Sequence, residues 1–366
     1  MRVLLLSSIA ALVAVAAPGA GATPVRPVPT TGRSQAGLSA AADGVVRDAM
    51  RKQNIPGVAL VVLRDGKVVH QAGYGIADLE QNLPVRPDTA FNIGSLSKQF
   101  LAEGILLLVQ EGKVALDAPV SRYLPDAPSS WSAITIRHLL SHTGGLVREA
   151  PGFDGAKVQS DIDVIRSAYG VPLNAPAGTR FEYSNLGYFI LAEVISRTSG
   201  KPWPAFFAER VFGPLGMNAT RPTSLVDLIP NRARGYAWEE GRFRNAQSYL
   251  ALRPSGAFTS TVADLAKWEK VLAQGGLTGG APRAEMWTPA KLSSGETAPY
   301  GFGWRLETVD GHAEINHGGS LPGFRSYYLR YPEANLAIIV LTNNNGAVPG
   351  EIARGIARLV LAKPGA

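Results

Sequence analysis

Hydrophobic and polar positions change their spacing along the chain. Apolar residues recur at helical intervals over residues 38–53, whereas residues 58–63 and 67–74 are short β-like runs. Asp65-Gly66 stands between these two runs, and an Asp-Gly pair in that place is typical of a hairpin turn. The pattern therefore predicts a helix followed by a β-hairpin.

The middle of the chain has helical spacing, and the last third returns to β-like runs. The predicted helices cover residues 95–110, 135–141, 185–199, 202–212 and 261–274, the last capped by Ser260 or Thr261. The predicted strands after them cover residues 302–309, 312–317, 324–331 and 336–342, and a helix over 350–361 comes last.

Strands at both ends of the chain and helices between them predict an α+β fold with three layers, α/β/α. In the simplest arrangement, the N- and C-terminal strands pair in one antiparallel sheet and helices flank it. Residues 116–260 would then form an inserted helical lobe of one domain over 37–362, with a cleft between the lobe and the sheet.

The N-terminal residues 1–22 have the pattern of an export signal. Arg2 precedes an apolar run over 3–17, and Ala20-Gly21-Ala22 is a small-x-small cleavage pattern. The run is shorter than the about 20 residues of a membrane span, although a retained anchor is the alternative. We predict cleavage near Ala22, a linker over 23–36, and a secreted or periplasmic bacterial protein.

The composition excludes several kinds of site. No cysteine occurs among the 366 residues, so disulfides and thiolate metal ligands are ruled out. The net charge is +7, but no block of like charges marks a nucleic-acid tail. We expect a small-molecule or peptide substrate, with no cofactor, metal or nucleic acid and no stable membrane insertion after signal cleavage; the oligomeric state stays open.

Ser95 and Lys98 are the strongest candidates for chemistry. They lie three positions apart at the start of a predicted helix, so both side chains lie on one face. A serine hydroxyl needs a neighbouring base to become a nucleophile, and a desolvated lysine can be that base. A bare Ser-x-x-Lys is a weak pattern, but this one is unique in the chain. It also follows Gly94, and a glycine suits a place where a ligand comes close to the backbone.

Two further motifs add polar groups. In Tyr183-Ser184-Asn185, the tyrosine can relay protons and the asparagine amide can orient a substrate, unless the pair is only a packed tyrosine beside a helix cap. In His317-Gly318-Gly319-Ser320, the glycines let backbone N–H groups approach a ligand, unless the segment is a tight turn. Such N–H groups could form an oxyanion hole with that of Ser95.

The order of these motifs resembles the serine β-lactamase and penicillin-binding superfamily. The chain is similar to class C β-lactamases, D-alanyl-D-alanine carboxypeptidases and β-lactamase-like esterases over about 40–345. The similar segments are residues 91–98, 139–146, 176–185, 211–217, 254–258, 260–268, 300–304 and 317–323. The resemblance implies an antiparallel sheet flanked by helices with a helical lobe, as the pattern predicts.

The resemblance also implies a role for each residue. Ser95 would be the acylated nucleophile, Lys98 its activating partner, and Tyr183 the general base and later the acid. Asn185 would position the substrate, and His317 would stand where many members have lysine. The backbone N–H groups of Ser95 and Ser320, beside Gly319, would form the oxyanion hole.

The third motif departs from that of many true β-lactamases. His317 replaces a permanent cation by a group expected to titrate near pH 6.5, at about its ordinary pKa. Gly318 lacks the hydroxyl that would help to bind a β-lactam carboxylate. His142-Thr143-Gly144 mimics this motif but comes before Tyr183, so we interpret it as a structural helix end.

The preferred hypothesis is an exported serine hydrolase with a Ser95 acyl-enzyme. Its substrate would be a D-amino-acid peptide, a short-acyl ester or a β-lactam-like compound, and carboxypeptidase or esterase activity ranks above efficient β-lactamase activity. The alternative is a non-catalytic penicillin-binding or sensor protein on the same fold. The presence of Ser95, Lys98 and Tyr183 favours the enzyme, because a decayed site would lose at least one of them.

Overall fold

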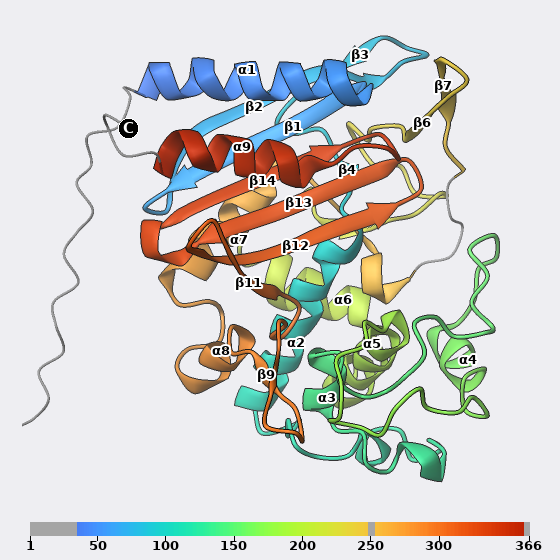
Figure 1. The fold of residues 1–366 in the computed structure, drawn as a ribbon. Coiled ribbons are helices and arrows are strands. Elements are labelled where there is room, and N and C mark those ends of the chain that lie inside the picture. The colour runs from blue at the N-terminus through green and yellow to red at the C-terminus, as the bar shows by residue number, and fades with distance from the viewer. Residues whose placement is uncertain (1–34, 248–252, 362–366) are drawn as a thin grey trace, which may run out of the picture. The chain divides into compact units, whose positions relative to one another are not determined.

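The computed structural model describes residues 35–247 and 253–361, so the predicted signal segment lies outside the described residues. A seven-stranded antiparallel sheet runs through them in the order β11-β12-β13-β14-β1-β2-β3 (Figure 1). Its strands are β1 (Gly57–Arg64), β2 (Lys67–Asp78), β3 (Leu83–Pro84), β11 (Arg305–Val309), β12 (His312–Leu321), β13 (Phe324–Tyr331) and β14 (Leu336–Thr342). The N- and C-terminal strands meet where β1 pairs with β14, which confirms the predicted sheet.

The hairpin of β1 and β2 forms as its turn residues require. Asp65 and Gly66 have φ angles of +50° and +70°, the left-handed pair that a two-residue turn needs to match the twist of its strands. The side chains of β1 alternate between two cores: Val58 and Leu60 face one, and Ala59 and Val61 face the other. The sheet is therefore covered on both faces.

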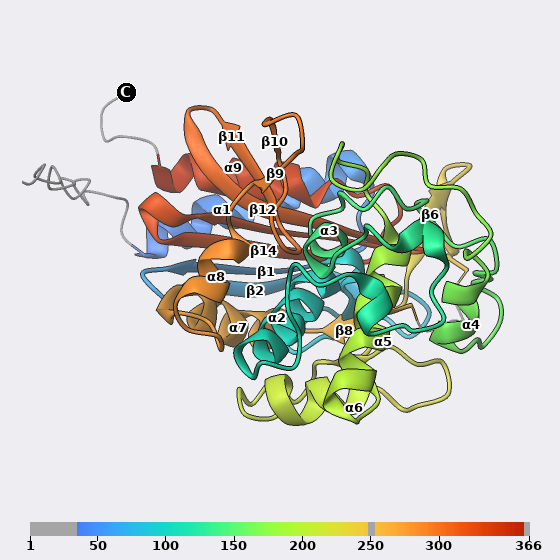
Figure 2. The same cartoon turned by 90° about the horizontal axis from the view of Figure 1, so that it is seen from below.

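Helices supply these covers. The terminal helices α1 (Gln35–Gln53) and α9 (Pro349–Leu361) pack together on one face, as Figure 1 shows. In α9, Ile352, Ala353, Ile356 and Ala357 are buried, the spacing of one helix face. On the opposite face, Figure 2 shows α2 (Ser97–Gln110) and α7 (Val262–Gln274), the latter capped by the predicted Thr261. The three-layer α+β fold is thus confirmed.

The region between the two parts of the sheet is mainly helical. Its helices are α3 (Ile136–Leu140), α4 (Asp161–Arg166), α5 (Asn185–Ser199) and α6 (Trp203–Phe207), with α8 (Ala281–Met286) beyond α7. Short strands accompany them: β4 (Phe91–Asn92), β5 (Arg221–Pro222), β6 (Tyr236–Glu239), β7 (Arg242–Asn245), β8 (Phe258–Ser260), β9 (Ala290–Lys291) and β10 (Thr297–Ala298). Helices α2 and α5 pack against each other, and each is apolar on most of its surface.

Several short elements have no counterpart among the predicted ones. The helices α4 and α8, the β6–β7 hairpin and the strands of two or three residues are too short to show a period. Strand β12 continues four residues beyond the predicted end at 317, so Gly318 and Gly319 lie within a strand and not in a turn.

Across the part of the chain that is described, every helix is too short or too polar to span a bilayer.

Candidate active site

Ser95 lies in a 3₁₀ turn, Gly94–Leu96, that leads into α2. Gly94 has a φ of +55°, and a Cβ atom there would lie 2.7 Å from the backbone nitrogen of Ser320. A Cβ at Gly319 would lie 2.0 Å from the carbonyl oxygen of Ile93. Glycines at both places therefore let β12 approach the turn that carries Ser95.

Lys98 is fully buried one helical turn beyond Ser95. Its Nζ donates hydrogen bonds to Asn185 Oδ1 at 2.8 Å and to the Ser255 carbonyl at 2.7 Å, and it lies 3.2 Å from Ser95 Oγ. Burial holds the pKa of Lys98 well below its ordinary value, and the positive charge of Arg253 lowers this pKa further. This shift favours loss of the proton, and the neutral amine keeps two N–H groups for Asn185 and Ser255 and a lone pair for the Ser95 hydroxyl.

Asn185 is the first residue of α5, yet it does not cap the helix. Ser184 is the cap, since its side chain accepts the N–H of Gly187. The Asn185 amide is left to join Lys98 on one side and Glu149 on the other. The Glu149 carboxylate also accepts hydrogen bonds from Arg253 at 2.6 and 2.7 Å, which anchors the group.

Tyr183 completes the cluster from the loop before α5. Burial raises its pKa to about 12, while a hydrogen bond with Ser95 acts in the opposite direction. Lys98 Nζ lies 4.8 Å and the guanidinium carbon of Arg148 lies 5.1 Å from the centroid of the ring. Near neutral pH, Tyr183 is therefore a phenol and not a tyrosinate, and it lies beside Ser95 and Lys98.

His317 is buried in β12, and each of its ring nitrogens has a hydrogen-bond partner. Nε2 lies 2.8 Å from the Tyr300 hydroxyl, and Nδ1 lies 2.7 Å from the Gly318 carbonyl. Since a carbonyl only accepts, Nδ1 carries the proton and Nε2 accepts from Tyr300. Burial, followed by the charge of Lys98, lowers the pKa of His317 to about 3. The prediction of a titration near pH 6.5 is therefore wrong, because it assumed an exposed imidazole.

A cleft of about 600 Å³ joins Ser95 and Tyr183 to the edge of β12 and the start of α9. Ser320 and Gly319 line it, as does His317. Its charged lining residues are four arginines and one carboxylate, namely Arg148, Arg305, Arg325, Arg354 and Glu351. The cleft is therefore positively charged along its wall. Within the described ranges, no group of three His, Asp or Glu side chains is arranged to hold a metal.

Sequence reasoning missed several neighbours of the site. Glu149 lies in the stretch 147–172, which has no readable motif, and Ser255 contributes only its backbone carbonyl. Both are brought to Lys98 across more than fifty residues of chain, so local spacing could not indicate them. His142 was interpreted as a helix end, but its ring packs on Tyr183 at 4.1 Å between centroids.

Comparisons of sequence identify the family of the chain. Residues 42–363 match the family described as Beta-lactamase. The chain is 30% identical over 299 residues to penicillin-binding protein 4* of Bacillus subtilis, a match that covers 76% of this chain and 66% of that protein. It is 28% identical over 309 residues to a D-aminopeptidase of Gluconobacter oxydans, covering 80% of this chain and 56% of the relative. The chain thus spans less than two thirds of these relatives.

Two solved structures have a similar fold. A penicillin-binding protein homologue from Pyrococcus abyssi, described as octameric, superposes with a TM-score of 0.78 at 28% identity, over 88% of this chain and 77% of that chain. The D-amino acid amidase of Ochrobactrum anthropi gives a TM-score of 0.77 at 25% identity, over 88% and 98% of the two chains.

Proposed function

The chain belongs to the Beta-lactamase family, and on that premise we propose that it is an exported serine hydrolase that works through a Ser95 acyl-enzyme. One observation carries the proposal: the Ser95 hydroxyl lies 3.2 Å from a buried amine whose pKa is lowered. An amine of this kind is neutral often enough to accept the serine proton, which makes the hydroxyl a nucleophile.

Acylation then proceeds with three proton transfers. Ser95 Oγ attacks the substrate carbonyl as its proton passes to Lys98 Nζ, and the oxygen of the tetrahedral intermediate is bound by the N–H groups of Ser95 and Ser320. When the intermediate collapses, the leaving group takes the phenolic proton of Tyr183, and the Lys98 ammonium returns a proton to the phenolate. Water attacks the ester in the same manner and releases the acid.

The directions of the two pKa shifts support this division of roles. Burial lowers the pKa of Lys98 and raises that of Tyr183 to about 12, so the amine is the better base and the phenol the better acid. Tyr183 would therefore act first as the acid, whereas the family resemblance implies that it acts first as the base. A protonated Lys98 beside a Tyr183 phenolate would need the reverse shifts.

The cleft favours a substrate with a negative charge. Its wall carries four arginines against one carboxylate, and the charge of Arg305 acts at both Tyr183 and His317. A free C-terminal carboxylate of a D-amino-acid peptide would meet this requirement. The neutral His317 and the missing hydroxyl at Gly318 make efficient β-lactam turnover less favourable than carboxypeptidase or short-acyl esterase activity.

Hydrolysis of p-nitrophenyl butyrate tests the nucleophile. We expect turnover by the purified protein and a loss of about 10⁴-fold or more in Ser95→Ala. Ser129→Ala, in an exposed turn away from the cleft, is the matched control and should keep full activity. Equal rates for wild type and Ser95→Ala would refute the acyl-enzyme.

Intact mass after penicillin treatment separates the alternatives. A hydrolase with fast deacylation returns to its unmodified mass, whereas a binding or sensor protein keeps one added acyl group on Ser95. A persistent adduct without turnover of esters or D-peptides would therefore favour the non-catalytic penicillin-binding protein.

A further inference from the structure

His142 is a buried histidine beside the site that takes no part in the steps above. It is 1% exposed and has a φ of +58°, a region that few residues other than glycine and asparagine adopt. Its ring lies 4.1 Å from the ring of Tyr183, with 35° between the planes. Backbone strain of this kind persists only where the surrounding structure holds it.

His142 is attached to the chain on both sides of Tyr183. Its carbonyl accepts a hydrogen bond from the N–H of Glu182 at 2.8 Å, and its Nδ1 accepts one from the N–H of Ser184 at 3.1 Å. Between these bonds, its ring packs on the Tyr183 side chain. A single residue therefore fixes both the backbone and the ring of Tyr183.

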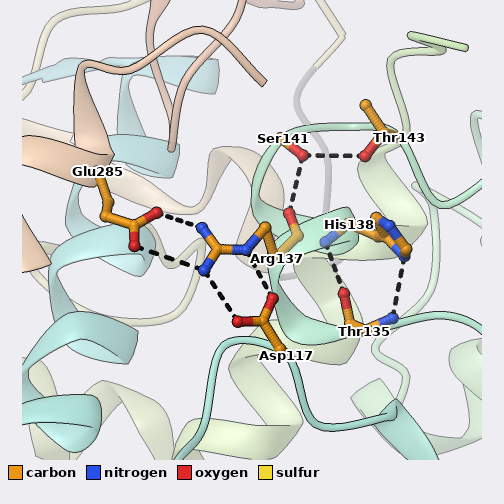
Figure 3. A network of polar contacts seen from close by, with 7 residues as sticks. All are labelled: Asp117, Thr135, Arg137, His138, Ser141, Thr143 and Glu285. Atoms are coloured by element: carbon orange, nitrogen blue, oxygen red, sulfur yellow. Dashed lines mark hydrogen bonds and ion pairs between the residues drawn. The ribbon is translucent and has the colours of Figure 1, made fainter. Parts of the chain in front are cut away.

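The helix before His142 is anchored at its first turn, as Figure 3 shows. Thr135 caps the start of α3 in a capping box with His138, whose Nδ1 accepts the Thr135 N–H at 3.3 Å. Arg137 binds two carboxylates that come from distant parts of the sequence, those of Asp117 and Glu285. Helix α3 is thus held in place by contacts outside the site.

The turn after α3 is fixed in the same network. Ser141 Oγ donates to the Arg137 carbonyl at 2.8 Å and lies 3.0 Å from Thr143 Oγ1 (Figure 3). His142 stands between these two residues, so its own position follows from that of the helix. Through the contacts of His142, the fixed position of α3 also fixes the position of Tyr183.

The imidazole of His142 is neutral. Burial holds its pKa well below the ordinary value, and the positive charge of Lys98 lowers it further. Because Nδ1 accepts a hydrogen bond, the proton lies on Nε2, which is buried and finds no hydrogen-bond partner among residues 35–247 and 253–361. The ring therefore adds no charge beside Lys98 or Tyr183, and its effect is geometric.

We propose that His142 is a positioning residue that holds the Tyr183 hydroxyl against Ser95 during proton transfer. The inference rests on the proposed function, in which Tyr183 delivers the proton to the leaving group. A displacement of about 1 Å at a reacting group can lower the rate about 100-fold, so loss of the packed ring should lower kcat.

The test compares two histidines. His142→Asn removes the ring but keeps an oxygen that can accept the Ser184 N–H, and asparagine tolerates a positive φ. We expect kcat for p-nitrophenyl butyrate to fall about 10- to 100-fold, with KM changed by less than about twofold. The matched control His312→Asn removes an exposed imidazole at the start of β12, outside the cleft, and should leave kcat within about twofold of wild type. Should His142→Asn fail to fold, His142→Gln offers the same acceptor on a longer side chain.

A double-mutant cycle distinguishes positioning from a general loss of stability. In a Tyr183→Phe background, His142→Asn should cause no further fall in kcat, because no hydroxyl remains to be positioned. An equal fall in both backgrounds, or an equal fall in His312→Asn, would overturn the inference. Full kcat in Tyr183→Phe alone would instead refute the proton-transfer role of Tyr183, and the positioning role with it.

Discussion

Two positively chargeable side chains, Lys98 beside Ser95 and Arg354 in the wall of the cleft, have opposite environments. Lys98 is fully buried, and its three polar neighbours are a hydroxyl, an amide and a carbonyl. The Arg354 side chain is 30% exposed and donates to the buried Glu314 carboxylate at 2.8 Å. Burial lowers the pKa of Lys98, whereas the hydrogen bond to Glu314 raises that of Arg354.

The difference shows how one fold separates chemistry from binding. Neutral acceptors around a buried amine leave it able to lose its proton, so Lys98 suits proton transfer. A guanidinium is charged with or without a partner, and the ion pair with Glu314 fixes Arg354 in the wall of the cleft. Together with Arg148 and Arg325, which form no ion pair with a carboxylate among the described residues, this wall suits the recognition of anions. The following substitutions test proton transfer at Lys98 and binding at the arginine wall, from the largest expected effect to the smallest.

Lys98→Arg should have the largest effect. It retains a positive charge but cannot lose a proton, so we expect kcat for p-nitrophenyl butyrate to fall by about 10²–10⁴-fold. Lys113→Arg, at an exposed ion pair with Glu111, is the control and should behave like wild type. If Lys98→Arg kept its kcat, a fixed cation would be sufficient and Lys98 would not be the base.

His317 shares the environment of Lys98, which predicts a dependence of stability on pH. Its pKa is about 3 in the folded chain and about 6.5 when unfolded, so the unfolded state binds the proton first as the pH falls. The contribution is fully present above pH 6.5 and is lost as the pH falls toward about 3. Relative to His317→Asn, the wild type should lose about 2 kcal/mol of unfolding free energy between pH 7 and pH 5.

Urea unfolding of both proteins at the two pH values measures this difference. A constant difference between wild type and His317→Asn would mean that the buried imidazole titrates as it does in water. The same protein pair tests activity, because folded His317 should produce no inflection in the pH–rate profile above about pH 5.

The arginine wall should show the smallest effect, limited to one class of substrate. Arg305→Gln is expected to lower kcat/KM about tenfold for a D-amino-acid peptide with a free carboxylate, the amount of one charge-assisted hydrogen bond. The amidated peptide and p-nitrophenyl butyrate should be hydrolysed at unchanged rates. A similar loss with the amidated peptide would show that Arg305 acts on the catalytic groups and not on a carboxylate.

Much of the fold could be predicted because its determinants are local. The Asp65-Gly66 turn, the Thr261 cap and the apolar stripe of α9 each depend on neighbouring residues, and each formed as expected. The end of β12 did not, since Gly318 and Gly319 belong to a turn or a strand according to what lies beside them. Here antiparallel pairing with β13 continues through Gly318 and Gly319, so the segment is a strand.

The sequence by itself determined which side chains could react. The spacing of Ser95 and Lys98 at a helix start is a local property, and the order of the motifs indicated the family. Only the tertiary structure decided in which state these groups are held. It buried Lys98 and His317 and brought Glu149 and His142 to the site from other segments. A pKa depends on burial and on neighbouring charges, and contacts between distant residues create both.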